Sequence, residues 1–228
     1  SILKKILDSP QEFLKAKRWD LGPIPTQRAM ANFSVNCSDA EHDLRPLFWK
    51  TYKAGEAFGI VNIKNLNKYG RLVDGPKDDD FSVCVNPCGE MSGESSKIGQ
   101  GGGGEPCNLQ DINLAAINDV NEFIEASVLM HRWGKRVTCE DYRYPQTNEI
   151  IGRNRRVGTG ITGCLMRPDL FNPEVLDIAY RAIQQENIDY AKELNIPPSI
   201  RTTVIKPSGT LSKMWDVPCE GIHPAFSR

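Results

Sequence analysis

An amide, a thiol and a carboxylate alternate along one short stretch of this sequence, at Asn86, Cys88 and Glu90, with Pro87 and Gly89 between them. An extended backbone repeats its side-chain direction every second residue, so the three groups would face one side. A carboxylate beside a thiol disfavours the thiolate that a cysteine protease needs. A neutral thiol that exchanges a hydrogen atom, with the carboxylate as nearby base, suits the pair better and indicates radical chemistry. The alternative interpretation is a strand end with a buried cysteine and two exposed polar residues.

A second candidate site follows the β-branched run 202–205. A helix is expected to begin after it, and backbone N–H groups at a helix N-terminus bind phosphate. Ser208 and Thr210 would add hydroxyl groups, Gly209 would allow close approach, and Lys206 would add charge. A capped helix without a ligand is the alternative. The chain has no G-x-x-x-x-G-K-[ST] motif, so ATP hydrolysis is not indicated.

Two further patterns carry less information. Residues 158–163 have the form G-x-G-x-x-G, but no acidic residue follows at the spacing of a dinucleotide site, so close packing of a strand is the better interpretation. Arg153, Arg155 and Arg156 form a basic cluster, which is either a solvated helix end or a group that helps to hold phosphates.

The seven cysteines are an odd number, and the N-terminus lacks the long apolar centre of a signal peptide. Reduced thiols in a cytoplasmic protein are therefore expected. Cys84 and Cys88 lie four apart, but no second pair completes a zinc site, and no metal site is predicted. Packing roles are expected for Cys37, Cys139, Cys164 and Cys219, and structural roles for His42, His131 and His223.

These candidate residues need elements to position them. Capping and periodicity predict helices over residues 10–18, 44–54, 119–133 and 173–195, with Gly134 as a stop signal. Strands are expected over residues 32–37, 57–63, 81–86 and 202–205. This alternation predicts an α/β fold with mainly parallel strands, whose sites lie in the loops after the strands.

Length and charge exclude several classes of protein. The chain has 228 residues, enough for one large domain, and 28 basic against 29 acidic residues, so no basic surface for nucleic acid is indicated. No apolar run is long enough for a transmembrane helix. The glycine-rich stretch 99–104 is typical of a flexible loop.

The segment Asn86-Pro87-Cys88-Gly89-Glu90 resembles the finger-loop motif of ribonucleotide reductases. Other segments resemble the same family in order, over nearly the whole chain. They are NFSV (32–35), GIVN (59–62), PCNL (106–109), INL (112–114), RRVGTGITG (155–163), KPSGTLS (206–212) and GIHP (221–224). The combination of IPPSI (196–200) with KPSGTLS is most similar to the adenosylcobalamin-dependent (class II) ribonucleoside-triphosphate reductases.

The resemblance implies a role for each candidate residue. Cys88 would be the thiyl radical that takes hydrogen from the ribose 3′ carbon, Glu90 would deprotonate the 3′ hydroxyl, and Asn86 would hydrogen-bond the sugar. Cys107, 19 positions after Cys88, would be half of the reducing cysteine pair, with its partner upstream of this chain. By the same resemblance, Ser34 would contact the substrate, and Ser208, Gly209 and Thr210 would bind its phosphates.

The resemblance also implies a fold and partners. Residues 1–228 would be the C-terminal portion of a ten-stranded α/β barrel with a central finger loop. Because an incomplete barrel leaves open strand edges, the chain would need the N-terminal half as a separate chain. The whole enzyme would reduce ribonucleoside di- or triphosphates for DNA synthesis, with a thioredoxin-like reductant. Adenosylcobalamin would supply the radical, or else a separate metal-containing subunit would.

Two other functions stay open. One is a non-catalytic fragment that binds nucleotide or a partner subunit. The other is an anaerobic glycyl-radical relative, although no glycyl-radical loop is visible in this sequence.

Overall fold

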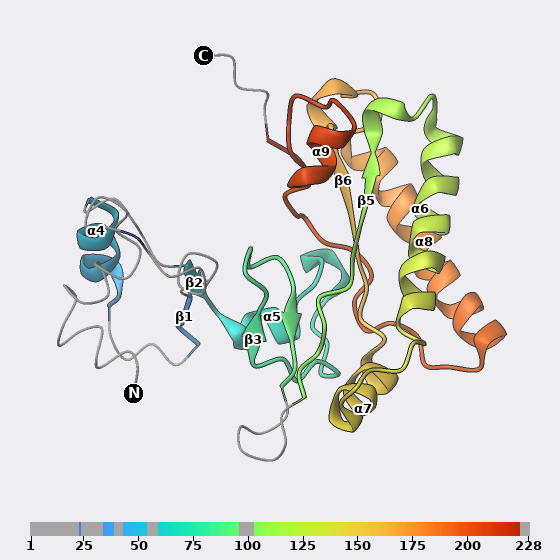
Figure 1. The fold of residues 1–228 in the computed structure, drawn as a ribbon. Helices are drawn as coiled ribbons and strands as arrows, with labels where there is room; N and C mark the ends of the chain where they lie inside the picture. Colours follow the sequence, from blue (N-terminus) through green and yellow to red (C-terminus); the bar gives the residue numbers. More distant parts are fainter. Residues whose placement is uncertain (1–22, 24–33, 39–42, 54–58, 96–102, 224–228) are drawn as a thin grey trace.

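The computed structural model describes residues 23, 34–38, 43–53, 59–95 and 103–223. Helices and strands alternate along this part of the chain, which confirms the predicted α/β class (Figure 1). Of the strand pairs among the described residues, two are parallel and one is an antiparallel hairpin. The helix expected over residues 10–18 lies outside the described residues.

The best-packed part of the molecule is built on the parallel strands β5 (Leu109–Asn113) and β6 (Gly158–Thr162). Helices α6 (Val120–Val137) and α8 (Pro173–Leu194) run side by side and cover one face of this pair (Figure 1). The core between these elements includes Ile112, Leu114, Phe123, Leu170 and Ala179. Burial of each large apolar side chain stabilises this half by roughly 1.5–3 kcal/mol.

Both long helices begin with a side-chain cap at the start of the range predicted from capping and periodicity. Asp119 accepts a hydrogen bond from the Glu122 backbone N–H at 2.9 Å, and Asn172 accepts one from the Val175 N–H at 3.0 Å. The predicted stop at Gly134 is wrong, because α6 continues to Val137. A Cβ atom on that glycine would lie 2.4 Å from the Gln110 side chain, so the residue serves close packing of α6 on β5.

A hairpin of residues 84–93 follows helix α5 (Ile63–Lys68) and the short turn η2 (Leu72–Asp74). Its paired strands are β3 (Cys84–Val85) and β4 (Ser92–Gly93), much shorter than the predicted strand over 81–86. Phe81 and Val83 are 64% and 60% exposed, whereas Ser82 is 2% exposed. The apolar side chains of this segment therefore face outward, and a polar one is buried.

The remaining elements lie around these two parts. Strand β1 (Ser34–Asn36) pairs in parallel with β2 (Gly59–Val61), and helix α4 (Arg45–Lys53) lies beside them, on the far side of the hairpin from β5 and β6 (Figure 1). The predicted strand 202–205 is reduced to a bridge between Thr203 and Thr159. The other elements are η3 (Leu114–Ala116), α7 (Pro145–Asn154), which was not predicted, η4 (Cys164–Met166) and α9 (Thr210–Met214). None of the described helices is long and apolar enough to cross a membrane.

Candidate active site

The hairpin tip reverses the chain, so the extended backbone on which the alternation of Asn86, Cys88 and Glu90 depends does not occur. The Gly89 N–H donates to the Asn86 carbonyl at 2.9 Å, and the Asn86 N–H donates to the Met91 carbonyl at 2.9 Å. Pro87 has the fixed φ that a turn favours at this position, and Gly89 has a φ of +80°, which a residue with a side chain rarely adopts. The Asn86 side chain closes the loop by accepting a hydrogen bond from the Met91 N–H at 3.0 Å.

The turn nevertheless brings the predicted groups together. The Asn86 amide donates to the Cys107 sulfur across 3.2 Å, which joins the hairpin tip to the segment that leads into β5. Partial desolvation raises the pKa of the Cys107 thiol, and the Asn86 hydrogen bond opposes that rise. The nearby charges of Glu90 and Cys88 raise the pKa further, so the thiol form is favoured. The thiols of Cys88 and Cys107 are both exposed, which suits groups that must reach a substrate or a reductant.

Glu90 has a carboxylate oxygen available for a ligand. Its Oε2 atom is buried and has no hydrogen-bond partner among the described residues. The residue lines a cavity of about 750 Å³, together with Met91, Ser92 and Ile205. Cavities of this volume accommodate small molecules, and a buried carboxylate oxygen needs a hydrogen-bond donor. The residues that line this cavity do not include Asn86, Cys88 or Cys107, so the cavity does not connect the carboxylate with the thiols.

Lys206 does not act as the free charge expected beside the phosphate loop. Its ammonium group forms a buried ion pair with Asp111 on β5, at 3.1 Å from Oδ2. Thr162 on β6 donates its hydroxyl to the same oxygen at 3.1 Å. Sequence reasoning missed Asp111, and its only signal was an acidic residue inside an otherwise buried strand.

The loop of Ser208, Gly209 and Thr210 begins a helix, as predicted, because α9 starts at Thr210. Gly209 has a φ of +55° with open space where a Cβ would be. Ser208 is buried, and its hydroxyl has no partner among the described residues. A buried free hydroxyl before a helix is compatible with an anion ligand, and the phosphate role stays a prediction.

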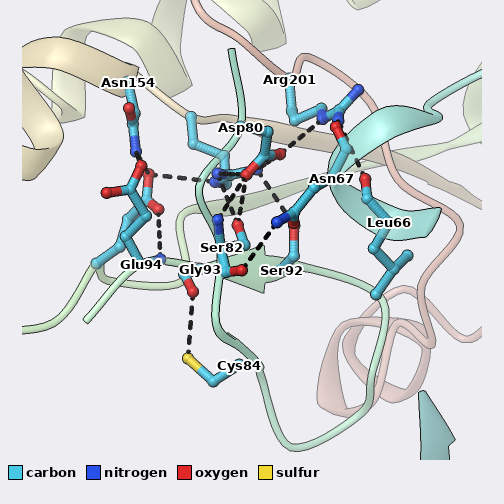
Figure 2. A network of polar contacts seen from close by, with 12 residues as sticks. Leu66, Asn67, Asp80, Ser82, Cys84, Ser92, Gly93, Glu94, Asn154 and Arg201 are labelled. Carbon is cyan, nitrogen blue, oxygen red and sulfur yellow. Dashed lines mark hydrogen bonds and ion pairs between the residues drawn. The ribbon is translucent and has the colours of Figure 1, made fainter. Parts of the chain in front are cut away.

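A buried ion-pair network lies at the base of the hairpin (Figure 2). It consists of Asp80, Glu105, Arg156 and Arg201. Arg156 binds both carboxylate oxygens of Asp80 at 2.9 Å each, and Arg201 binds Oδ2 at 3.0 Å. Burial alone would raise the pKa of Asp80, but the hydrogen bonds and charge of Arg156 outweigh it and hold that pKa far below its usual range.

The three arginines of the basic cluster have different surroundings in the structure. Arg156 is neither solvated nor free for phosphate, since its side chain is 1% exposed and ion-paired. Arg153 forms an ion pair with Glu94 on the hairpin side of the network. Arg155 ends α7 with a φ of 46° and donates to the Thr138 carbonyl. The interpretation as a solvated helix end is therefore confirmed for Arg153, which is 51% exposed in the last turn of α7, and is wrong for the buried Arg156.

Ser34 lies on a different part of the molecule from the hairpin tip, and no hydrogen bond or ion pair between described residues joins Ser208, Gly209 or Thr210 to that tip. It lies exposed on β1, paired with Gly59, away from the hairpin tip (Figure 1).

Among the cysteines, Cys164 and Cys219 are buried as predicted, whereas Cys139 is exposed, so its expected packing role is wrong. His131 is fully buried, in agreement with a structural role, and His42 lies outside the described residues. The described residues include no group of three or more His, Cys, Asp or Glu side chains placed to hold a metal ion.

Comparisons with known proteins agree with the motifs. No protein-family model matches the chain. The adenosylcobalamin-dependent ribonucleoside-triphosphate reductase of Lactobacillus acidophilus is 31% identical over 93% of this chain, and that of Lactobacillus leichmannii is 32% identical over 93%. A crystal structure of a B12-dependent (class II) ribonucleotide reductase superposes with a TM-score of 0.70 and 26% identity, over 93% of this chain and 33% of the other. The chain spans about a third (32%) of the length of the curated relatives that it matches.

Proposed function

We propose that this chain carries the catalytic centre of an enzyme that reduces ribonucleotides to 2′-deoxyribonucleotides. The chain is similar to class II ribonucleotide reductases over about a third of their length. The observation that carries the proposal is the convergence of Asn86, Cys88, Glu90 and Cys107 at one hairpin tip. The similarity to reductases over 93% of the chain supports the same chemistry.

Each of these residues has a chemical role. A thiyl radical at Cys88 would take the hydrogen atom from the ribose 3′ carbon, while Glu90 accepts the proton of the 3′ hydroxyl. The 2′ hydroxyl then leaves as water, and a cysteine pair that includes Cys107 supplies two electrons as it becomes a disulfide. Cys88 finally returns its hydrogen atom to the 3′ carbon. Asn86 holds the Cys107 sulfur and, in this proposal, also contacts the sugar.

Adenosylcobalamin, which the relatives' names specify, supplies an organic radical when it is bound. The residue that fits this chemistry is Cys88, because its thiol is exposed at the end of a projecting hairpin. We assign no other described residue to this cofactor. A separate metal-containing radical subunit is the alternative radical source, and the relatives' names do not favour it.

The substrate is proposed to be a ribonucleoside di- or triphosphate, with its phosphates at Ser208, Gly209 and Thr210. The buried, unpartnered hydroxyl of Ser208 and the open space at Gly209 support this placement. We also retain Ser34 as a substrate contact by resemblance alone, since its position on β1 gives no independent support. A thioredoxin-like protein is the proposed reductant of the cysteine pair.

The active form is proposed to contain the rest of a ten-stranded barrel with the hairpin as its finger loop, residues 1–228 being the C-terminal portion. The outward-facing Phe81 and Val83 and the 72% exposed Ile205 support this, because such side chains are normally covered by neighbouring elements. The N-terminal half, as a separate chain, is the proposed partner.

The test is a chimera in which this chain replaces the matching third of the Lactobacillus leichmannii reductase. With a ribonucleoside triphosphate, adenosylcobalamin and thioredoxin, the chimera should form deoxyribonucleotide. Glu90→Gln should lower the rate by about 10²–10⁴-fold, the usual contribution of a general base. Glu125→Gln, on the exposed side of α6, is the matched control and should leave the rate unchanged.

The non-catalytic alternative makes a different prediction for the same chimera. It would bind the nucleotide and form no deoxyribonucleotide, and the Glu90 substitution would then have no rate to change.

A further inference from the structure

Arg156 contacts both segments that carry the reactive thiols. On the hairpin side, its guanidinium donates to the Ser82 hydroxyl at 3.0 Å and to the Ser92 hydroxyl at 3.3 Å. Ser92 lies in β4, and Ser82 lies two residues before β3, so one side chain holds both strands at the hairpin base. On the other side, its Nε atom lies 3.1 Å from a carboxylate oxygen of Glu105, two residues before Cys107.

These contacts form a closed path through the fold. Arg156 lies two residues before β6, whose first residue, Gly158, pairs with Leu109 at the start of β5. Cys107 lies two residues before Leu109, and its sulfur accepts the hydrogen bond from Asn86 at the hairpin tip. The hairpin is therefore fixed at its base by Arg156 and at its tip by the segment that leads into β5.

The other members of the network fix Arg156 itself. Asp80 binds it with both oxygens, which sets the plane of the guanidinium group. Arg201 binds Asp80 and also donates to the Leu66 and Asn67 carbonyls of α5 at 3.1 and 2.6 Å (Figure 2). The two arginines balance the two carboxylates of Asp80 and Glu105, so the network is neutral overall.

We infer that Arg156 is a positioning residue, which sets the separation between the Cys88 and Cys107 thiols by clamping the hairpin base and the Glu105 segment together. Neither thiol touches Arg156, so its role is exerted through Ser82, Ser92 and Glu105. The inference rests on the proposed function for its relevance to catalysis, and the contacts that carry it are independent of any substrate.

The experiment measures the thiol separation directly in the full chain. A short bis-methanethiosulfonate reagent is added, and the peptide that joins Cys88 to Cys107 is followed over time by mass spectrometry. In the wild type this cross-link should form readily. In Arg156→Met it should form about tenfold more slowly, because displacements on the order of 1 Å strongly change such proximity-dependent rates. Arg143→Met, an exposed arginine, is the matched control and should behave as the wild type.

A charge-balanced variant separates positioning from folding. Asp80→Asn combined with Arg156→Met removes one charge of each sign, so the net charge of the network does not change. Its denaturant midpoint, measured beside that of Arg156→Met, shows whether each variant is folded under the reaction conditions, and the folded double variant should cross-link slowly. Cross-linking at the wild-type rate in this double variant would overturn the inference.

A third variant covers the case in which both methionine variants fail to fold. Arg156→Lys keeps the positive charge but loses the bidentate ion pair with Asp80, so this variant should fold and cross-link slowly. A wild-type rate in Arg156→Lys would then overturn the inference, as would a wild-type chain in which Cys88 and Cys107 never cross-link.

Turnover in the chimera provides the link to function. Arg156→Lys should lower kcat by about 10²-fold with little change in KM, as misplacement of reacting groups does. Because cross-linking needs no nucleotide, cofactor or turnover, an inactive chimera would contradict the proposed function and leave the positioning role standing.

Discussion

The two halves of this molecule are held together by different forces. The half built on β5, β6, α6 and α8 has an apolar core in which Leu114 and Cys164 are fully buried. The hairpin half has polar groups inside and apolar groups outside, and Asp80 and Arg156 fix its position. Apolar packing is tolerant of small shifts, whereas paired charges impose geometry. The half that carries Asn86, Cys88 and Glu90 is therefore the half whose geometry is fixed by ion pairs.

The largest effect is expected from breaking the apolar half. Phe123→Ala should reduce the free energy of unfolding by about 3–5 kcal/mol, because it removes a 2% exposed ring and leaves a cavity. Urea denaturation followed by circular dichroism measures this loss. Leu129→Ala, on the same helix but 56% exposed, should change stability by about 0.5 kcal/mol or less. Equal losses in the two variants would mean that the core is misassigned.

The hairpin half should respond locally when its network is broken. Asp80→Ala removes the carboxylate that Arg156 and Arg201 share and leaves the buried Arg156 with Glu105 alone, at a cost of about 3 kcal/mol to the hairpin's attachment. Hydrogen exchange should show faster exchange at the hairpin amides, while α6 and α8 keep their protection. Asp79→Ala, its exposed neighbour, is the matched control and should leave exchange unaltered. Uniform loss of protection across both halves would contradict the division between them.

A change from pH 7 to pH 5 should act on the apolar half through His131. Burial and the Lys135 charge lower the pKa of His131 from 6.5 to about 4. The unfolded chain therefore binds a proton below pH 6.5 that the folded chain takes up only near pH 4, so stability falls as the pH drops through this window. From pH 7 to pH 5 the loss is about 2 kcal/mol.

Substitution by an apolar residue isolates this effect. Between pH 7 and pH 5, His131→Leu should lose about 2 kcal/mol less stability than the wild type, as measured by urea denaturation. The stabilising charge of Asp80 is not involved, because its pKa is lowered and it stays ionised across this range. A wild-type stability that does not decrease between pH 7 and pH 5 would refute the burial of a neutral His131.

The sequence predicted the apolar half better than the hairpin half, for a physical reason. Periodicity and caps such as Asp119 and Asn172 are local signals, so both starts and the end of α8 were predicted to within one residue, whereas α6 extends four residues beyond its predicted end. The pairing of Arg156 with Asp80 joins residues 76 positions apart, and no local pattern encodes it. The end of α6 was predicted wrongly at Gly134, because this glycine allows α6 to pack closely against Gln110. That contact is also non-local, so the sequence pattern does not reveal it.

The roles of the candidate site residues stay predictions, whereas their geometry differs from the expected one. Asn86, Cys88, Glu90 and Cys107 were recognised from their motifs, and the structure brings them together by a turn rather than by an extended strand. The ion pair of Lys206 with Asp111 could not be predicted, because it depends on how β5 lies against the segment before α9.

The most direct test of the central claim is deoxyribonucleotide formation by two cysteine variants of the chimera, assayed with adenosylcobalamin and thioredoxin. Cys84 lies on the same hairpin and is exposed like Cys88, so Cys84→Ser is a close control for Cys88→Ser. Cys88→Ser should abolish product while nucleotide binding persists, and Cys84→Ser should retain the wild-type rate. Deoxyribonucleotide formed by Cys88→Ser at that same rate would contradict the assignment of the radical to this thiol.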